Sequence, residues 1–272
     1  MNAAEPGLDL DAYLTRIGLR DRPSLAEVHR AHVVAIPFEN LDPRRGVPVS
    51  LALEDIQRKL VTERRGGYCF EHNLLFAAAA RELGAEVEPM LGRVGPRDAP
   101  GRSRSHLALR VRAGGAEWHM DVGFGNGTLL EPIPFGPGEE VVQAGWHRRV
   151  VAHGGELVLQ SAGADGRWAD VYSFAPEPAP HIDLETSNWF TSTHPRSRFV
   201  GGLVVTVHHA DGTRSALSDW SGTLRLIEQA PDGESAVEVG PDAAGRLLAE
   251  RFGLPGWALD GSGRPVPEAA TS

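Results

Sequence analysis

The chain has 272 residues, of which 41% are hydrophobic and 23% charged, a composition typical of a globular protein long enough to bury a core. Its formal net charge is −9 and its pI is about 5.7, which argues against nucleic acid or an anionic membrane surface as the main partner. The single cysteine, Cys69, excludes an intramolecular disulfide and any cysteine-based zinc site.

The apolar runs and the N-terminus indicate a cytoplasmic protein. The first residues, MNAAEPGLDLDAYL, have neither the basic nor the apolar segment of a secretory signal. No run approaches the roughly 18 apolar residues that a membrane-spanning helix needs. We therefore expect a protein of the reducing cytoplasm that engages no membrane, and we expect no metal site.

Residues 1–84 are expected to be helical. Leu10 and Ile17 fall on one face of a first helix, with Leu14 between them on the same face. Ser24 and Glu27 form a capping-box pattern that opens a second helix.

Two further helices follow in the same region. Ser50 is predicted to cap a third helix, which carries Ile56 on its apolar face. A fourth helix is predicted from about residue 69 to 83, with Gly84 as its C-terminal stop. Because its sequence is mostly apolar, we expect this fourth helix to be central and buried.

Residues 85–180 are expected to form an antiparallel barrel or curved sheet. Six short runs rich in β-forming residues carry this prediction: EVEPMLGRV, SHLALRVR, EWHMDVGF, HRRVVAH, GELVLQSA and WADVYSF. Segments rich in glycine and proline separate them and read as turns.

Residues 181–272 are expected to complete the fold with a small α/β region. A connector over residues 175–195 carries a short helix, and a hairpin is predicted around Asp211–Gly212. The segment PDAAGRLLAERFGL reads as a capped helix, and residues 260–272 as a loose tail. A helical bundle, then β structure, then a small α/β region makes an α+β protein.

Cys69 is the first candidate functional residue. Gly66 and Gly67 permit a tight turn or a close backbone approach just before it. This turn delivers the thiol to the start of the fourth helix, where the helix dipole and free backbone N–H groups favour a thiolate. A nucleophile also needs a base. The residues around Cys69 alone leave an inert buried cysteine equally open.

The hairpin SHLALRVRAGGAEWHMDVGFG supplies a candidate base. With a two-residue turn at Gly114–Gly115, Arg112 pairs with Glu117, and His106 and Asp121 become diagonal neighbours on one face. A carboxylate that orients an imidazole, which in turn activates a thiol, is the logic of a Cys-His-Asp triad. A surface His–Asp pair on a solvated sheet face is the alternative.

Five separated segments resemble those of the arylamine N-acetyltransferase family, in the same order and with similar spacing. They are IPFENLD (36–42), RRGGYCFEHN (64–73), SHLALRV (105–111), DVGFG (121–125) and SNWFTSTHPRSRF (187–199). The resemblance runs from about residue 8 to 255. It implies a helical bundle (1–84), a β-barrel (85–180) and an α/β lid (181–272), the first two forming a cysteine-protease-like core.

The resemblance also implies an activity. It assigns Cys69 as nucleophile, His106 as its base and Asp121 as the orienting carboxylate. The implied reaction is ping-pong: acetyl-CoA, the co-substrate, acylates Cys69, CoA leaves, and an arylamine or hydrazine attacks the thioester. This chemistry requires positioning and an oxyanion hole, and the backbone N–H of Cys69 is a natural donor for one.

Binding residues follow from the same resemblance. Phe38, Phe124 and Phe199 match aromatic residues that line the substrate pocket, and ordinary core packing is the alternative for each. Arg102, Ser103, Gly125 and Phe190 match positions near the CoA moiety. Arg102 and Arg104 either meet a phosphate of CoA or are solvated loop charges. Arg196 stands where a smaller residue is common in relatives, which leaves the preferred acceptor open.

Three further features are interpreted as structural. His72 lies one helical turn after Cys69 and suits support better than proton abstraction. His208 and His209 precede a hairpin turn and are expected to be exposed rather than metal ligands. Glu39 and Arg65 are predicted to form an ion pair that braces the glycine turn.

Three other functions stay open on the sequence. A related amide synthase would take a long acyl chain from an acyl carrier protein and close a macrolactam with the same triad. A thiol hydrolase would accept water in place of an amine. A non-catalytic binding or redox-sensing protein would use Cys69 alone, without help from His106.

Overall fold

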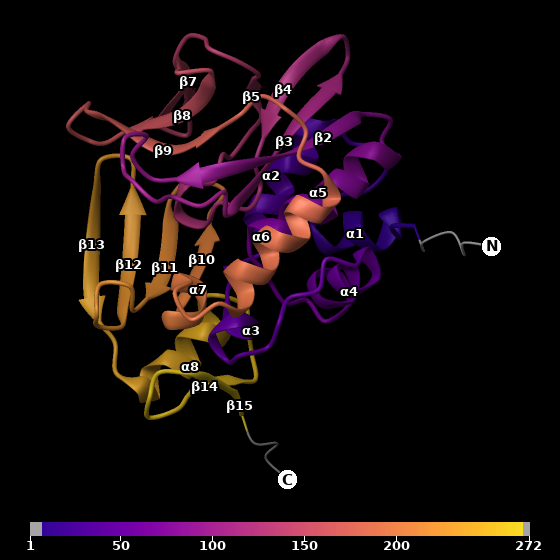
Figure 1. Ribbon diagram of the computed structural model, residues 1–272. Coiled ribbons are helices and arrows are strands. Elements are labelled where there is room, and N and C mark those ends of the chain that lie inside the picture. Colours follow the sequence, from indigo (N-terminus) through magenta and orange to yellow (C-terminus); the bar gives the residue numbers. More distant parts are fainter. Residues whose placement is uncertain (1–6, 269–272) are drawn as a thin grey trace.

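The computed structural model describes residues 7–268 and begins with a group of helices (Figure 1). These are α1 (Leu10–Arg16), α2 (Leu25–Ala35), α3 (Leu41–Arg44), α4 (Leu53–Gln57), the π-helix η1 (Arg58–Thr62) and α5 (Cys69–Glu82). The capping box predicted for α2 is confirmed: the Glu27 N–H donates to Ser24 Oγ, and the Ser24 N–H donates to the Glu27 carboxylate.

Helix α5 occupies the centre of this group, as predicted. Its Leu75 and Phe76 are fully buried and pack with Leu14, Val28 and Leu60 in one apolar core. Helix α5 ends where Gly84 adopts a φ of +91°, a left-handed conformation that suits glycine.

The predicted cap of the third helix is wrong. Helix α4 begins at Leu53 with Ala52 as its N-cap, and no side chain caps it. The hydroxyl of Ser50 instead accepts a hydrogen bond of 3.2 Å from the Ala52 N–H, two residues on. Serine often makes this local turn, and it removes the hydroxyl from a capping role.

The middle of the chain forms an eight-stranded antiparallel sheet in the order β5-β4-β3-β2-β9-β8-β7-β6, which curves into a nearly closed barrel. Its strands are β2 (Glu86–Val94), β3 (His106–Ala113), β4 (Ala116–Met120), β5 (Ile133–Pro134), β6 (Val141–Gln143), β7 (Trp146–His153), β8 (Glu156–Ala162) and β9 (Trp168–Phe174). All six predicted runs contain a strand, although β4 ends at Met120 and leaves residues 121–124 of its run outside the sheet; the short β5 and β6 were not predicted. The 3₁₀ turn η2 (Gly125–Gly127) follows β4.

A second sheet, in the order β1-β10-β11-β12-β13, joins distant parts of the chain. Its strands are β1 (Phe38–Glu39), β10 (Val204–His208), β11 (Arg214–Ser218), β12 (Arg225–Ala230) and β13 (Gly233–Glu238). In Figure 1 this sheet lies beside the barrel, with α6 (His181–Thr193) and α7 (Arg198–Gly201) near it. Because β1 pairs with β10, the N-terminal segment is tied to the C-terminal sheet.

The C-terminal segment is more ordered than predicted. Helix α8 (Pro241–Glu250) is followed by β14 (Trp257–Leu259) and β15 (Pro265–Pro267), which pair antiparallel. The predicted loose tail, 260–272, therefore includes a strand, while its residues 269–272 lie outside the described part of the chain. Trp257 is buried with α8 in an apolar cluster, and this burial holds the strand pair in place.

The predicted hairpin around Asp211–Gly212 is confirmed, but the exposure predicted for the adjacent histidines is wrong for His208. This residue is 5% exposed, and its Nε2 donates to the Gly125 carbonyl over 2.8 Å. The face of β10 that carries His208 packs towards η2, so the hairpin stands against the barrel rather than in solvent.

These elements confirm the predicted α+β class. Within residues 7–268, no helix has the length and apolarity needed to cross a membrane.

Candidate active site

The Gly66–Gly67 turn places Cys69 at the first position of α5. A side chain at Gly66 would put its Cβ 2.0 Å from the Pro37 carbonyl oxygen, and one at Gly67 would lie 2.6 Å from the Glu71 carboxylate. Neither glycine has a positive φ, so close backbone approach is the reason for both. The turn is therefore packed against the segment before β1.

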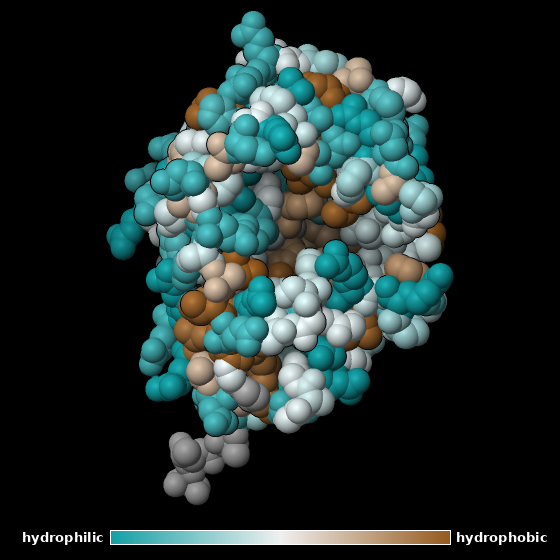
Figure 2. Space-filling model, turned by 90° about the vertical axis from the view of Figure 1, so that its left-hand side faces the viewer, coloured by the Kyte–Doolittle hydropathy of each residue, from teal (hydrophilic) through white to brown (hydrophobic). Residues whose placement is uncertain are grey.

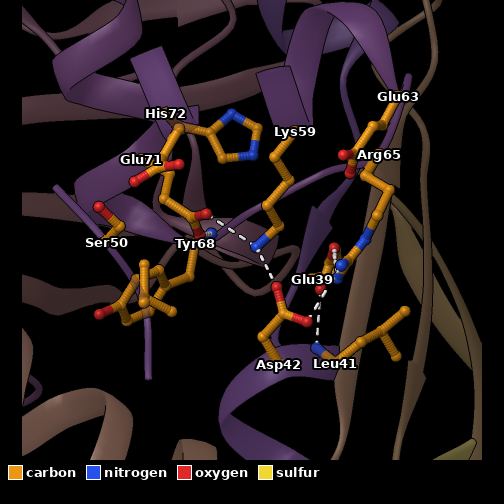
Figure 3. A network of polar contacts seen from close by, with 12 residues as sticks. Glu39, Leu41, Asp42, Ser50, Lys59, Glu63, Arg65, Tyr68, Glu71 and His72 are labelled. Atoms are coloured by element: carbon orange, nitrogen blue, oxygen red, sulfur yellow. Dashed lines mark hydrogen bonds and ion pairs between the residues drawn. The ribbon is translucent and has the colours of Figure 1, made fainter. Parts of the chain in front are cut away.

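A buried network of charges braces this turn (Figure 3). Arg65 pairs with Glu39 at 2.7 Å and with Asp42 at 3.0 Å, so the predicted Glu39–Arg65 pair is confirmed. Lys59, the only lysine of the chain, pairs with Asp42 at 2.8 Å and with Glu71 at 2.7 Å.

The network reaches the start of α5 through Glu71. Its Oε2 accepts a hydrogen bond of 3.1 Å from the Tyr68 N–H, the residue immediately before Cys69. Burial raises the pKa of Glu71, while the neighbouring Lys59 lowers it in part. The charged network thus holds the backbone immediately before the thiol.

The predicted hairpin register is confirmed, and it brings His106 and Asp121 together. Arg112 pairs with Glu117, and Leu109 with Met120. His106 Nε2 lies 2.8 Å from Asp121 Oδ2, and the two residues are 2% and 1% exposed. The alternative of a solvated surface pair is therefore wrong.

Asp121 is held by four donors. Besides His106, its carboxylate accepts hydrogen bonds from Asn73 Nδ2 (3.1 Å), the Gly123 N–H (3.0 Å) and the Tyr172 hydroxyl (2.8 Å). Burial by itself raises the pKa of Asp121, but the charge of His106 and these hydrogen bonds hold it well below its usual range. Asp121 is therefore a fixed anion.

The Asp121 carboxylate raises the pKa of His106 and orients its ring. Burial by itself lowers the pKa of His106, but the charge and hydrogen bond of Asp121, together with a hydrogen bond to Cys69, raise it to about 10. Since Nε2 is bonded to Asp121, Nδ1 is the ring nitrogen left for the thiol. The Cys69 sulfur lies 3.7 Å from the Ser105 carbonyl oxygen, beside His106, and the residue is 3% exposed.

His72 has the supporting place predicted for it. Its Nδ1 lies 2.8 Å from His32 Nε2, and its Nε2 donates to the Pro37 carbonyl over 3.2 Å. Burial lowers the pKa of His72 to about 4. With both nitrogens occupied by other partners, the ring stays neutral and holds the segment before Phe38.

A cavity of about 650 Å³ opens above the thiol. It brings together Cys69, His106 and all seven predicted binding residues, whereas Asp121 stands behind His106 and does not line it. The face drawn in Figure 2 is hollowed, with hydrophobic side chains deep in the hollow and hydrophilic ones around its rim. The volume is that of a typical small-molecule site.

Aromatic rings form the inner wall of this cavity. Phe124 meets His106 edge-on at a centroid distance of 4.9 Å. Phe38 lies 6.1 Å from Phe199, which meets Trp220 edge-on at 5.5 Å. Gly125 allows Phe38 to approach, because a Cβ there would lie 3.3 Å from the ring.

The residues predicted to lie near CoA differ in how firmly their side chains are held. Arg102 donates to the backbone carbonyls of residues 93, 95, 97 and 99, and so organises its own loop. Arg104 is 41% exposed and lies 3.8 Å from Glu177. Phe190 stacks on His194 at 4.5 Å, and Ser103 lines the cavity beside it.

Several residues at the site were not predicted. Asn73 and Tyr172 both bond to Asp121. Asn73 lies four residues after Cys69 and therefore on the same helix face, a signal that the sequence contained. Trp220 and Arg198 also line the cavity, and neither was predicted as a site residue, although Arg198 lies within the segment 187–199. Within residues 7–268, no cluster of three or more His, Cys, Asp or Glu side chains is arranged to hold a metal ion.

Comparison with known proteins agrees with this geometry. The sequence model of a family described as N-acetyltransferase matches residues 21–255. An arylamine N-acetyltransferase of Mycolicibacterium smegmatis is 47% identical over 213 residues, which cover 74% of this chain and 76% of that protein.

Two other relatives extend the comparison. The structure of Mycobacterium marinum arylamine N-acetyltransferase in complex with CoA superposes with a TM-score of 0.84 at 37% identity, covering 90% of this chain and 93% of that one. A proansamycin X synthase of Amycolatopsis mediterranei is 34% identical over 184 residues, covering 64% of this chain and 70% of the synthase. The chain belongs to the arylamine N-acetyltransferase family, which includes the related amide synthases.

Proposed function

We propose that the protein transfers an acetyl group from acetyl-CoA to the nitrogen of an arylamine or arylhydrazine, through a thioester on Cys69. The observation that carries this proposal is the buried His106–Asp121 pair, 2.8 Å apart, next to the only thiol of the chain at the floor of a cavity. The family membership supports the choice of acyl transfer over other thiol chemistry.

In the first half-reaction Cys69 is the nucleophile. His106 takes the proton of the Cys69 thiol, and the sulfur attacks the carbonyl carbon of acetyl-CoA. The bond between that carbon and the CoA sulfur then breaks, and His106 gives the proton to the departing CoA thiolate. Cys69 is the first residue of α5, where a backbone N–H has no partner within the helix, and this N–H would stabilise the developing oxyanion. Asp121 keeps the imidazole oriented and stabilises its charged form.

In the second half-reaction the amine replaces CoA in the same cavity. Its nitrogen attacks the thioester carbonyl, the bond to the Cys69 sulfur breaks, and His106 passes the proton from the amine to the thiolate. An arylamine is a weak base and arrives unprotonated at neutral pH. Phe38, Phe124 and Phe199 offer it an aromatic wall.

The CoA moiety is assigned to other residues of the same lining. Ser103, Gly125 and Phe190 border the cavity where the pantetheine arm would pass. Arg102 contributes its charge there, but its hydrogen bonds hold its loop, so we assign it a supporting role rather than direct contact with phosphate.

The test follows CoA release from acetyl-CoA with a panel of arylamines and hydrazines. We expect release that depends on the amine and is lost in Cys69→Ala. His153→Gln, at an exposed site on β7, is the matched control and should keep the wild-type rate. No release with any amine would contradict the proposal, and release without amine would indicate a thiol hydrolase instead.

A second candidate is an amide synthase that closes a macrolactam from a chain delivered by an acyl carrier protein. The similarity to a proansamycin X synthase favours it. A synthetic long-chain thioester that carries its own aromatic amine distinguishes the two. Cyclisation at a rate above that of acetyl transfer would favour the synthase, whereas acylation by acetyl-CoA alone supports the acetyltransferase.

A further inference from the structure

Two arginines are buried side by side where the barrel meets the second sheet. Arg148 of β7 is 1% exposed and Arg214 of β11 is 4% exposed. Both guanidinium groups lie over the ring of Trp146, at 5.6 Å and 3.7 Å from its centroid. Trp146 itself joins the two sheets, because its Nε1 donates to the Gly212 carbonyl over 2.7 Å.

No carboxylate compensates these two charges among residues 7–268. Arg148 donates to the His147 carbonyl and to Ser161 Oγ, and Arg214 donates through Nη1 to the Asn126 carbonyl. All of these acceptors are neutral. Burial lowers the pKa of Arg214, and the nearby charge of Arg148 lowers it further. Arginine nevertheless keeps its proton in proteins, so two unneutralised cations share a buried region.

Their remaining donors point to a specific ligand chemistry. Nε and Nη2 of Arg214 are buried and have no hydrogen-bond partner among the described residues, and the same is true of Arg148 Nε. Nε and Nη2 form one edge of the guanidinium, and two parallel N–H groups on that edge match two oxygens of a carboxylate or phosphate. An uncompensated buried donor is costly, and a buried charge more so.

The surrounding atoms support a polar site at this junction. Thr206, His208 and Arg214 share the face of the second sheet that continues from the cavity-lining Ala216. Thr206 Oγ1 and His208 Nδ1 are also buried without a partner among the described residues, as is Asn126 Oδ1. The lining of the main cavity includes two neighbours of Arg214 in space. They are Asn126, whose carbonyl Arg214 contacts, and Ala216, two residues further along β11.

We propose that Arg214 and Arg148 form a binding site for a small oxyanion, with Arg214 Nε and Nη2 as its two-pronged contact and Arg148 as the second positive charge. The anion joins strand β7 of the barrel to strand β11 of the second sheet. It also secures η2, because Arg214 and His208 both bond to the backbone of residues 125 and 126. This assignment is independent of the acyl-transfer proposal.

The test uses inorganic phosphate as the probe. Wild-type protein is dialysed into a phosphate-free buffer and titrated by calorimetry and by thermal unfolding, at an ionic strength held constant with a bulky sulfonate salt. We expect saturable binding of about one phosphate per chain and a rise in Tm of about 5 °C at a hundredfold excess over Kd. Arg214→Met should abolish both effects.

Arg149→Gln is the matched control. Arg149 is the next residue of β7, but its guanidinium lies over Trp168 at 4.1 Å and its Nε donates to Gln160. This variant should keep the full phosphate response. If Arg214→Met does not fold, Arg148→Met and the wild-type titration provide the same test.

Ion chromatography of denatured wild-type protein detects an anion that dialysis fails to remove, and a stoichiometric anion found in this way supports the site. The proposal is overturned if the wild type neither binds phosphate saturably nor releases an anion on denaturation. A phosphate response that survives in Arg214→Met also overturns it, because the anion would then bind elsewhere.

Discussion

Replacing Lys59 by methionine should destabilise the protein far more than an ordinary charge substitution. The Lys59 side chain is 10% exposed, and its Nζ lies 2.8 Å from Asp42 and 2.7 Å from Glu71. Methionine has a similar volume but no charge. The change therefore leaves three buried carboxylates, those of Glu39, Asp42 and Glu71, with Arg65 as the one remaining cation of the network.

The magnitude follows from the burial. Removing one partner of a buried ion pair costs about 3–5 kcal/mol, because the other charge stays in a poorly solvated place. Lys59 serves two carboxylates, so we expect the upper part of that range and a fall in Tm of about 10 °C or more. Because Glu71 holds the Tyr68 N–H, Cys69 should also lose its fixed position.

Urea unfolding followed by circular dichroism measures the free energy of unfolding. The neighbouring Arg58→Met is the control, because Arg58 pairs with Asp55 and Glu63 but its side chain is 58% exposed. We expect that control to cost no more than about 1 kcal/mol. Combining Lys59→Met with Glu71→Gln should recover part of the loss. Equal costs for Lys59→Met and Arg58→Met would refute the reasoning.

Three further substitutions and one pH dependence test the site. Asp121→Asn removes the charge that raises the pKa of His106, so burial should then lower this pKa. Nitrogen NMR should show a neutral His106 ring at pH 7 in the variant and a protonated ring in the wild type; an unchanged His106 titration would mean that Asp121 does not raise the pKa. The pKa of His106, raised to about 10, also makes the free energy of unfolding depend on pH. The contribution of the charged imidazolium is fully present below pH 6.5 and is lost as the pH rises through 10, and urea unfolding across that range measures the loss. Gly123→Ala would bring a Cβ within 3.1 Å of the Cys69 Cα, so we expect a loss of about 1–3 kcal/mol in thermal unfolding and slower alkylation of the thiol; wild-type values for both would count against the packing described. Tyr172→Phe removes a donor to Asp121 and should cost about 1–3 kcal/mol by urea unfolding, and a neutral effect would mean that this hydrogen bond is dispensable.

The hairpin shows how far local sequence carries the prediction. The Gly114–Gly115 turn and the two-residue period of a strand fix the register, so the pairing of His106 with Asp121 followed from sequence alone. Their burial did not. The face of the hairpin that carries His106 and Asp121 also carries arginines and a glutamate nearer the turn. The barrel and α5 cover only the end of the hairpin away from the turn, where the His106–Asp121 pair lies.

Contacts between distant segments were the least predictable part. Strand β1 has two residues, and it exists because Phe38 and Glu39 pair with β10, about 165 residues later. The Glu39–Arg65 pair was predicted, whereas the contacts of Lys59 with Asp42 and Glu71 were not. The burial of His208 was also not predicted, because the turn after β4, rather than its own hairpin, covers this side chain.

The most direct test of the central claim is to isolate the acyl-enzyme. The protein is mixed with acetyl-CoA in the absence of amine, quenched in acid, and analysed by intact-mass spectrometry and peptide mapping. We expect a gain of one acetyl group, located on Cys69, absent from Cys69→Ala and removed by a chase with an arylamine. An acetyl group on another residue, or amine acetylation without any acetyl-Cys69, would contradict the account.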